Sequence, residues 1–250
     1  MKLAVLSDIH GIPIALDAVL ADIEQRGGVD GYLGLGDLVA QGYDPVSAAK
    51  TLAALPNAHF VRGNTDRYVC ARGLPRWLDF DHVEPERLDL VRSHAWTTGC
   101  LAAAGLLEWV QAIPLEYRFD LPDGTRVLCV HASPGKDDGS GLRQEQTDEE
   151  FSALLAGCEA DLVLVGHTHW PFDRSIAGVR VVNPGSVGYP RRTDLRGSYA
   201  LIEADESGYT VEIHRVGFDI DAVIRAVETS GFYPNPEWVI AHYSRESLPA

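Results

Sequence analysis

The sequence predicts an α/β fold with parallel strands, and three observations carry that prediction. Short apolar segments alternate with segments of helical periodicity over the first 61 residues, and a strand–helix–strand order implies right-handed crossovers between parallel strands. The apolar run Leu162–Val165 has strand length and no polar alternation, as expected for a strand buried on both faces. Five apolar segments end directly in polar side chains, and ligands bind at that edge of a parallel sheet.

Length and composition favour a globular protein with a sizeable core, because the chain has 250 residues of which 46% are hydrophobic. The net charge of −15 argues against a partner such as duplex nucleic acid, which needs a basic surface. No uncharged apolar stretch approaches the ~18 residues that a membrane span requires, and the first residues turn polar too soon for a signal peptide. We therefore expect a cytoplasmic protein without a membrane partner, and its oligomeric state stays open.

The first part of the chain is expected to alternate regularly between strands and helices. In order, we predict a strand at 2–7, a helix at 12–27, a strand at 31–35, a helix at 45–55 and a strand at 58–61. The first helix has apolar residues at helical spacing and stops at two glycines. The second begins at Pro45, a residue suited to the first helical turn.

Residues 67–118 depart from this rhythm, and we interpret them as an insertion or cap of a single domain that covers 1–250. Two helices are expected in the insertion, at 85–95 and 96–111, packed over the sheet edge.

After the insertion the strand pattern resumes. We predict a strand at 126–130, a helix at 147–157 opened by a capping box, strands at 162–165 and 179–182, a hairpin of 198–203 with 210–215, and helical structure over 219–244 broken near 234–236. Gly166 is expected to leave the sheet through backbone angles that a Cβ forbids.

Side chains suited to metal binding follow the ends of the predicted strands. They are Asp8, His10, Asp37, Asn64, His131, His167 and His169. Any one of these short motifs is weak evidence and taken alone has a structural explanation, whereas the ordered series is strong. Seven ligands exceed the needs of one ion and suit two divalent ions that share a carboxylate. Imidazole, carboxylate and amide ligands favour manganese, iron, zinc, nickel or cobalt; we expect manganese, and magnesium is a further alternative.

The motifs that hold these residues also carry a family resemblance. They read SDIHG (7–11), GLGDLV (34–39), RGNTD (62–66), VHASP (130–134), GHTHWP (166–171) and NPGSVGYPR (183–191). The chain resembles the calcineurin-like metallophosphoesterases, and within them the small bacterial and archaeal phosphodiesterase branch. The resemblance implies a four-layer αββα sandwich in which two mixed β-sheets are flanked by helices.

The resemblance also assigns the ligands. It implies that the first ion is held by Asp8, His10 and His169, the second by Asn64, His131 and His167, and that Asp37 bridges the two.

The activity implied is hydrolysis of a phosphoester, above all a small phosphodiester, by a metal-bridging hydroxide. Asp37 and Asn64 would be catalytic. Arg191 with Arg192, and the backbone amides of Gly185 and Ser186, are candidates for binding the substrate phosphate, with surface charge as the alternative for the two arginines.

One position departs from the pattern, because Thr65 stands where many relatives have the histidine that protonates the leaving group. Threonine has no useful pKa for that role. His94 or His82 could replace it, although a solvent-exposed helical histidine is the commoner case. Trp77, Trp170 and Tyr189 could stack on a base, and ordinary aromatic packing is the alternative.

Two other functions stay open at this point. One is a non-catalytic scaffold, the use that the retromer subunit with this fold shows. The other is a phosphomonoesterase or dinucleoside polyphosphate hydrolase, which Thr65 disfavours.

Overall fold

The computed structural model describes residues 1–70, 85–231 and 233–244, and among them the side chains of 85–87 are left out. In these parts of the chain the strands form two mixed five-stranded sheets flanked by helices. The α/β sandwich that the resemblance implies is therefore confirmed.

The first sheet has the order β10-β9-β1-β2-β3. Its strands are β1 (Lys2–Leu6), β2 (Gly31–Gly34), β3 (Ala58–Phe60), β9 (Gly197–Asp205) and β10 (Gly208–Val216). β1, β2 and β3 are parallel, with Leu3 opposite Gly31 and Tyr32 opposite Ala58. The antiparallel hairpin of β9 and β10 extends the sheet beyond β1. The predicted parallel unit and the predicted hairpin are both confirmed.

The second sheet has the order β4-β5-β6-β8-β7. Its strands are β4 (Glu116–Asp120), β5 (Arg126–Val130), β6 (Leu162–Leu164), β7 (Phe172–Ile176) and β8 (Val179–Asn183). β5, β6 and β8 are parallel and central, whereas β4 and β7 add antiparallel edges. The sequence analysis missed both edge strands. Exposed residues in these strands are interspersed with buried or half-buried ones. The strands therefore lack the continuous apolar run of a central strand.

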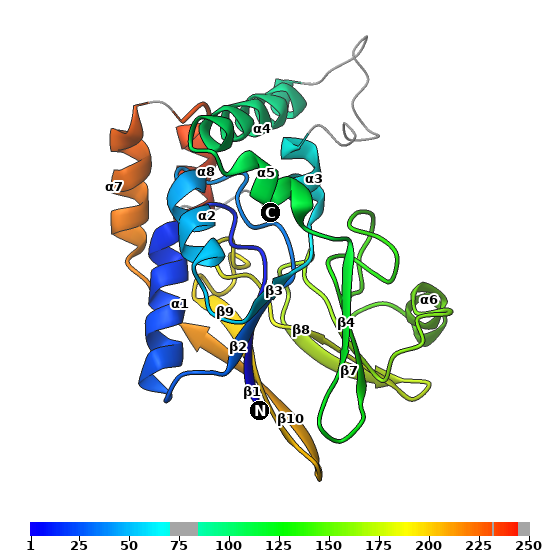
Figure 1. The fold of residues 1–250 in the computed structure, drawn as a ribbon. Helices are drawn as coiled ribbons and strands as arrows, with labels where there is room; N and C mark the ends of the chain where they lie inside the picture. Colours follow the sequence, from blue (N-terminus) through cyan, green and yellow to red (C-terminus); the bar gives the residue numbers. More distant parts are fainter. Residues whose placement is uncertain (71–84, 232, 245–250) are drawn as a thin grey trace.

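Helices cover the outer face of each sheet. α1 (Pro13–Gln25) and α2 (Pro45–Ala53) lie on the side of the first sheet, and α6 (Asp148–Leu154) lies on the side of the second (Figure 1). A separate apolar cluster between the sheets includes Val5, Leu33, Cys129 and Leu164. The layers are therefore helix, sheet, sheet and helix. None of the described helices is long and apolar enough to cross a membrane.

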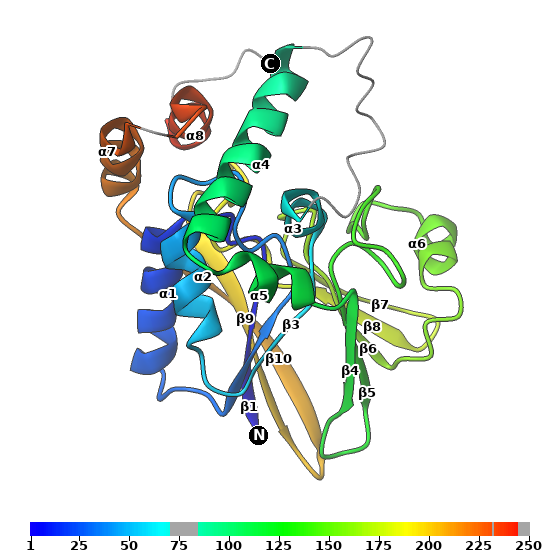
Figure 2. The same ribbon diagram turned by 45° about the horizontal axis from the view of Figure 1, so that its top comes forward.

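The helices of the predicted insertion differ from the expectation. α4 (Pro85–Ala103) runs without interruption through residues 95 and 96, and α5 (Leu107–Ala112) follows it. The break lies instead at Gly105, which has a φ of +71°, a left-handed value typical of a glycine after a helix. α4 packs against α2, α5 and α3 (Asn64–Val69), a short helix that the analysis missed (Figure 2). The predicted positions His82 and Trp77 lie outside the described residues.

The C-terminal part is helical with a break, as predicted. α7 (Ile220–Ser230) ends at Gly231 and packs against α8 (Pro236–Tyr243). A hydrogen bond from the Asn235 side chain to the Asp89 carbonyl ties this part to α4.

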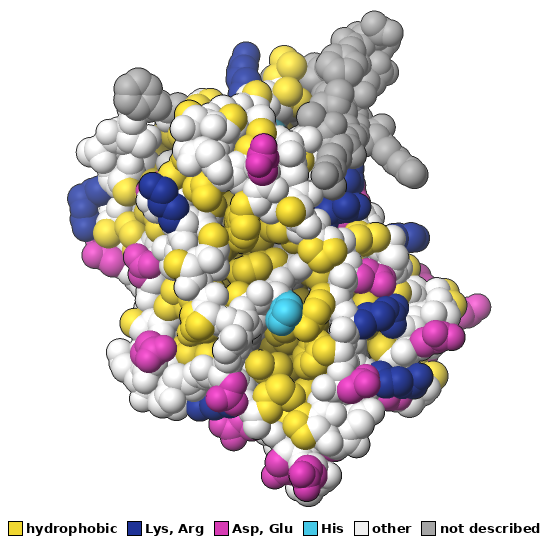
Figure 3. Space-filling view, in the orientation of Figure 1, with side chains coloured by type: hydrophobic (Ala, Val, Ile, Leu, Met, Phe, Trp, Pro, Cys, Tyr) yellow, Lys and Arg dark blue, Asp and Glu magenta, His cyan; other side chains and the backbone are white. Residues whose placement is uncertain are grey.

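Hydrophobic side chains gather on the face over β3 and β4 (Figure 3). A shallow cavity of about 250 Å³ on this face is lined by Leu3, Leu33, His59, Tyr117 and Phe119, among others. His59 stacks on Tyr117 with ring centroids 4.2 Å apart. His59 lies on β3 and Tyr117 on β4, and both strands are sheet edges. The sandwich is therefore open between these two edges.

Candidate metal centre

The seven predicted ligands follow the carboxyl ends of parallel strands from both sheets. Asp8 and His10 follow β1, Asp37 follows β2, and Asn64 begins α3 just after β3. The remaining three come from the second sheet, where His131 follows β5, and His167 and His169 follow β6. From the sequence we expected these side chains to meet at one edge of a single parallel sheet. In the structure they come from the edges of two sheets that lie together.

Five of these residues have left-handed backbone conformations, which a residue with a Cβ seldom adopts. They are Asp8, His10, Asp37, His167 and His169, with φ between 52° and 67°. Such values cost of the order of 1–3 kcal/mol each and concentrate at functional sites. This conformation was not predicted from the sequence. It turns the backbone sharply after each of these strands.

Gly166 has a different role from the one predicted. It is not among the residues with positive φ, so unusual backbone angles do not explain it. A Cβ at Gly166 would overlap with the Oγ of Ser7 and lie 2.8 Å from an Asp8 carboxylate oxygen. The glycine therefore allows the two sheets to approach closely beneath the centre.

Asp8, His10 and His169 form one group whose ligand atoms all lie within 4.8 Å of one another. The Oδ1 of Asp8 is 3.8 Å from the Nε2 of His10 and 3.2 Å from the Nε2 of His169. The two Nε2 atoms lie 3.2 Å apart. These three residues are the ones assigned to the first ion.

A second group joins Asp37, His131 and Asp8. The Oδ2 of Asp37 lies 3.4 Å from His131 Nε2 and 3.8 Å from His10 Nε2, so this carboxylate stands between the two groups. On the other side of His131, the rings of His131 and His167 have centroids 5.1 Å apart. The Nδ1 of His167 lies 3.0 Å from Asn64 Oδ1. All seven positions are thus neighbours.

Backbone carbonyls orient three of the four histidines. The pairs are His10 Nδ1 with Ala40 O at 3.0 Å, His131 Nδ1 with Leu35 O at 2.6 Å, and His169 Nδ1 with Tyr189 O at 2.6 Å. Since a carbonyl only accepts, each Nδ1 carries a proton, and Nε2 is the nitrogen that can bind a metal ion once any proton on it has left. His167 is reversed, because its Nε2 faces the Gly139 carbonyl at 2.9 Å.

Two buried atoms of the centre lack a hydrogen-bond partner among the described residues. They are Asp8 Oδ1 and His131 Nε2, and both residues are 0% exposed. An unpaired buried polar atom is costly, and a cation held between these atoms would satisfy both. The donor set therefore fits divalent metal ions.

The charges of the centre also favour binding of a cation. Burial alone would lower the pKa of His131, but the Asp37 and Asp8 carboxylates and the Leu35 carbonyl together outweigh burial and raise that pKa to about 10. Burial opposes ionisation of Asp37, but His131 and His10 outweigh it and hold the pKa of the Asp37 carboxyl well below its ordinary value. The buried carboxylates thus attract a positive charge, which a proton supplies without metal and a bound cation would replace.

Thr65 and Asp66 support the centre from α3. The backbone N–H and the Oγ1 of Thr65 both donate to Asp37 Oδ1, at 2.9 and 2.8 Å. The Asp66 carboxylate accepts from the backbone N–H groups of Leu38 and Gly63. Thr65 thus positions the carboxylate between the two groups, and Asp66 ties the two strand-end loops together.

His94 lies on α4 and is 6% exposed, so it is not the solvent-exposed helical histidine considered as the alternative. Its ring contacts that of Tyr68, with centroids 5.5 Å apart. Burial lowers the pKa of His94 to about 4. A histidine that is neutral at pH 7 has no proton to give a leaving group in the way the sequence analysis considered.

The predicted phosphate ligands of the 183–191 loop differ in placement. The backbone N–H of Gly185 already donates to the Asn183 side chain. The Ser186 hydroxyl donates to the Asp8 carbonyl, and Ser186 is 1% exposed. The Ser186 hydroxyl therefore holds the Asp8 backbone, and the Gly185 amide is used within its own loop. Arg191 is exposed and lies over the Trp170 ring, with its guanidinium carbon 4.8 Å from the centroid.

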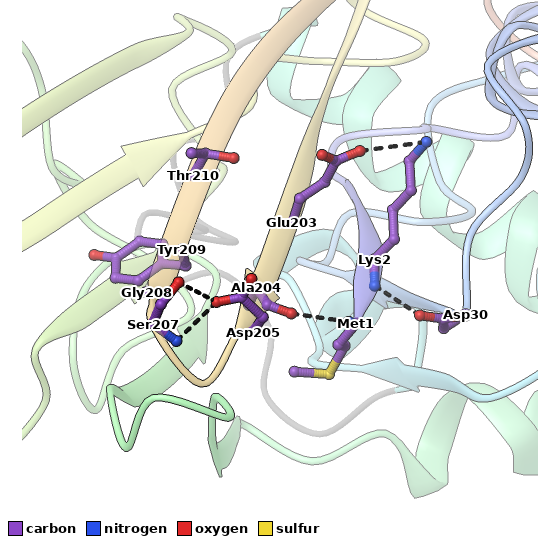
Figure 4. A pocket seen from close by; sticks show the side chains of 10 residues that line it. All are labelled: Met1, Lys2, Asp30, Glu203, Ala204, Asp205, Ser207, Gly208, Tyr209 and Thr210. Carbon is purple, nitrogen blue, oxygen red and sulfur yellow. Dashed lines mark hydrogen bonds and ion pairs between the residues drawn. The ribbon is translucent and has the colours of Figure 1, made fainter.

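A cavity of about 650 Å³ lies at the other end of the sheets, beside the first residue of β1 and the β9–β10 turn (Figure 4). Its polar side chains are paired with one another. The Lys2 ammonium lies 3.5 Å from Glu203, and the Lys2 backbone N–H donates to Asp30. This cavity is remote from the seven predicted ligands.

The fold and the site together are those of an α/β protein with a candidate metal centre between two sheets. A family model described as "Calcineurin-like phosphoesterase superfamily domain" matches residues 1–207. The chain belongs to this superfamily, and its membership supports a phosphoesterase hydrolase that uses divalent metal ions.

Individual relatives support the same fold. An uncharacterized protein of Methanocaldococcus jannaschii is 29% identical, with 95% of each chain covered. The crystal structure of a metallophosphoesterase from Sphaerobacter thermophilus is 25% identical, covers 98% of this chain and 99% of its own, and has a TM-score of 0.75. A hypothetical protein from Pyrococcus horikoshii is 24% identical, with 99% of each chain covered and a TM-score of 0.80.

Proposed function

We propose that the protein is a phosphodiesterase that uses two divalent metal ions, manganese first among them, to hydrolyse a small phosphodiester. Asp8, His10 and His169 would hold one ion. Asn64, His131 and His167 would hold the other, and Asp37 would bridge them. We place the enzyme in the cytoplasm, with a small phosphoester as its partner.

One observation carries this proposal. Asp37 has one oxygen fixed by Thr65, while the other lies between the imidazoles of His10 and His131. A carboxylate in that position is suited to touch two ions at once. Backbone carbonyls hold the Nδ1 of three of the histidines, so that their Nε2 atoms face the centre.

The chemistry divides between the ions and the chain. When bound, two divalent ions lower the pKa of water and neutralise charge on the phosphoryl group. The chain orients the reactants. Asn64 turns its Oδ1 toward His167, which leaves its amide N–H groups free to donate to a phosphoryl oxygen as charge develops there. Asn64, His167 and His169 are half-buried, so the substrate would enter on their side.

Thr65 favours diesters over monoesters with poor leaving groups. Its hydroxyl is committed to Asp37, and Thr65 is 2% exposed. The position therefore offers no acid to protonate a leaving alkoxide, which general acid catalysis would otherwise accelerate by a factor of the order of 10²–10⁴. Esters with good leaving groups depend less on such an acid.

The experiment is a comparison of model substrates on metal-reconstituted protein. With Mn²⁺ we expect turnover of bis-p-nitrophenyl phosphate and loss of at least about 10²-fold in Asp37→Asn. No turnover of any model ester with several divalent metals would reject the proposal in favour of the scaffold. Faster hydrolysis of monoesters or of dinucleoside polyphosphates would replace the diesterase assignment.

A further inference from the structure

A cavity of about 430 Å³ adjoins the candidate metal centre. Its lining includes His169, Trp170, Tyr189, Arg191, Arg192 and His242. His169 belongs to both the cavity and the first metal group. The Tyr189 ring packs edge-on against His10, with centroids 5.2 Å apart. The cavity therefore begins where a bound substrate would extend from the metals.

The cavity is positively charged in a protein whose net charge is −15. Two arginines are among the described residues that line it, and no carboxylate is among them. The wall thus departs from the charge of the rest of the chain. A concave basic site of this kind attracts anions.

Neither arginine has a carboxylate partner among the described residues. Most arginines in the described part of the chain pair with a carboxylate, as Arg126 does with Asp161 and Arg180 with Asp173. Among the same residues, Arg191 has only its contact with the Trp170 ring, and Arg192 donates to the Ala241 carbonyl. Two guanidinium groups without a counter-ion beside one cavity are suited to a phosphate.

His242 also belongs to this wall. The Nε2 of His242 is buried and has no hydrogen-bond partner among the described residues. The His242 ring stacks obliquely on Tyr189, with centroids 4.4 Å apart. His242 lies on α8 and Tyr189 in the segment after β8, so two distant parts of the chain build this wall.

We propose that this cavity binds a second phosphate group of the substrate, held by Arg191 and Arg192. The substrate class is then a small phosphodiester that carries a further phosphate beside the one that reacts. This inference rests on the proposed function for the position of the reacting phosphate, and it adds the chemistry of the remainder of the substrate.

Two chromogenic substrates that differ only in the second phosphate test the proposal. They are thymidine 5′-(p-nitrophenyl phosphate) and the same ester with a 3′-phosphate. With Mn²⁺ the wild type should have a kcat/KM at least about tenfold higher for the 3′-phosphorylated ester, because charge-assisted hydrogen bonds reach that size. In R191Q/R192Q that ratio should fall toward one. The matched control R225Q removes an arginine of α7 that pairs with Asp219, and it should keep the wild-type ratio.

A binding measurement separates this inference from the proposed function. Calorimetric titration of thymidine 3′,5′-bisphosphate into the metal-free protein should show binding that weakens at least about tenfold in R191Q/R192Q and in R191Q alone, but not in R225Q. If the wild type hydrolyses neither ester with any metal, the proposed function fails and the titration alone decides the inference. An unchanged ratio, or an unchanged affinity in both variants, overturns it.

Discussion

The position of each ligand atom at the centre depends on contacts that residue types do not reveal. Three histidines present Nε2 because a backbone carbonyl accepts a hydrogen bond from their Nδ1–H. The sequence motifs predicted which histidines gather, because both residues and spacing are visible in the chain. They could not name the acceptors, since every residue carries a carbonyl and only the folded backbone decides which one points inward.

Thr65 provides the sharpest test at this scale. Thr65→Val removes the Oγ1 bond to Asp37 Oδ1 and keeps the shape of the side chain, whereas Thr65→Ser keeps the hydroxyl. Supporting contacts of this kind contribute about 10–100-fold to metal affinity or activity. We expect Mn²⁺ affinity, measured by calorimetry, to fall by about that factor in Thr65→Val and to change much less in Thr65→Ser. Equal affinities in the two variants would remove the positioning role of Thr65.

His167 and His169 should serve different ions although one residue separates them. His169 faces Asp8, and His167 faces Asn64. Metal analysis of His167→Ala and His169→Ala should therefore find one equivalent missing in each, and the double variant should lose both. If the double variant retained as much metal as either single one, the two histidines would share a single ion.

At the level of elements, the strands most accessible to prediction were those buried on both faces. β1, β5 and β6 contain runs of at least three apolar residues, whereas the edges β4 and β7 contain no such run and were missed. α3 was missed because six residues are too few for a periodic signal. The left-handed turns after the strands could not be predicted either. Asp and His occupy positions with positive φ where glycine is the usual residue.

Gly166 tests how closely the two sheets approach. Gly166→Ala places a methyl group against Ser7 and Asp8, so we expect a loss of about 1–3 kcal/mol in the free energy of unfolding. The control is Gly99→Ala in α4, where an added Cβ meets nothing within 4 Å. This substitution should raise the free energy of unfolding by about 0.5–1 kcal/mol. Urea unfolding measures both. A neutral Gly166→Ala would mean that the sheets can separate without cost.

For the molecule as a whole, the sandwich explains why widely separated motifs converge. Each sheet brings parallel strand ends to one edge, and the closely packed core between the sheets fixes the distance between those edges. The sequence predicted the parallel unit of the first sheet directly, and the second sheet followed only from the family resemblance. Nothing in residue type indicated that β4 and β7 complete it.

The free energy of unfolding of the whole molecule should depend on pH through His94. Burial lowers its pKa to about 4, from the ordinary value of 6.5. Between those two pH values the unfolded chain binds a proton that the folded chain does not, so the free energy of unfolding falls as the pH decreases. His94→Gln should reduce this fall by up to roughly 3 kcal/mol between pH 7 and pH 4. Chemical denaturation at several pH values measures it, with the exposed His59→Gln as control. Parallel curves for wild type and His94→Gln would contradict the assignment.

If two ions at one seven-residue centre hydrolyse a phosphodiester, the activity must depend on both ions. Titration of Mn²⁺ into metal-free protein, with hydrolysis of bis-p-nitrophenyl phosphate followed at each step, measures this dependence. Turnover should rise with the second equivalent, level off at two ions per chain, and be abolished in Asp37→Asn. Turnover that levels off at one ion per chain, or that persists in Asp37→Asn, would overturn the two-ion proposal.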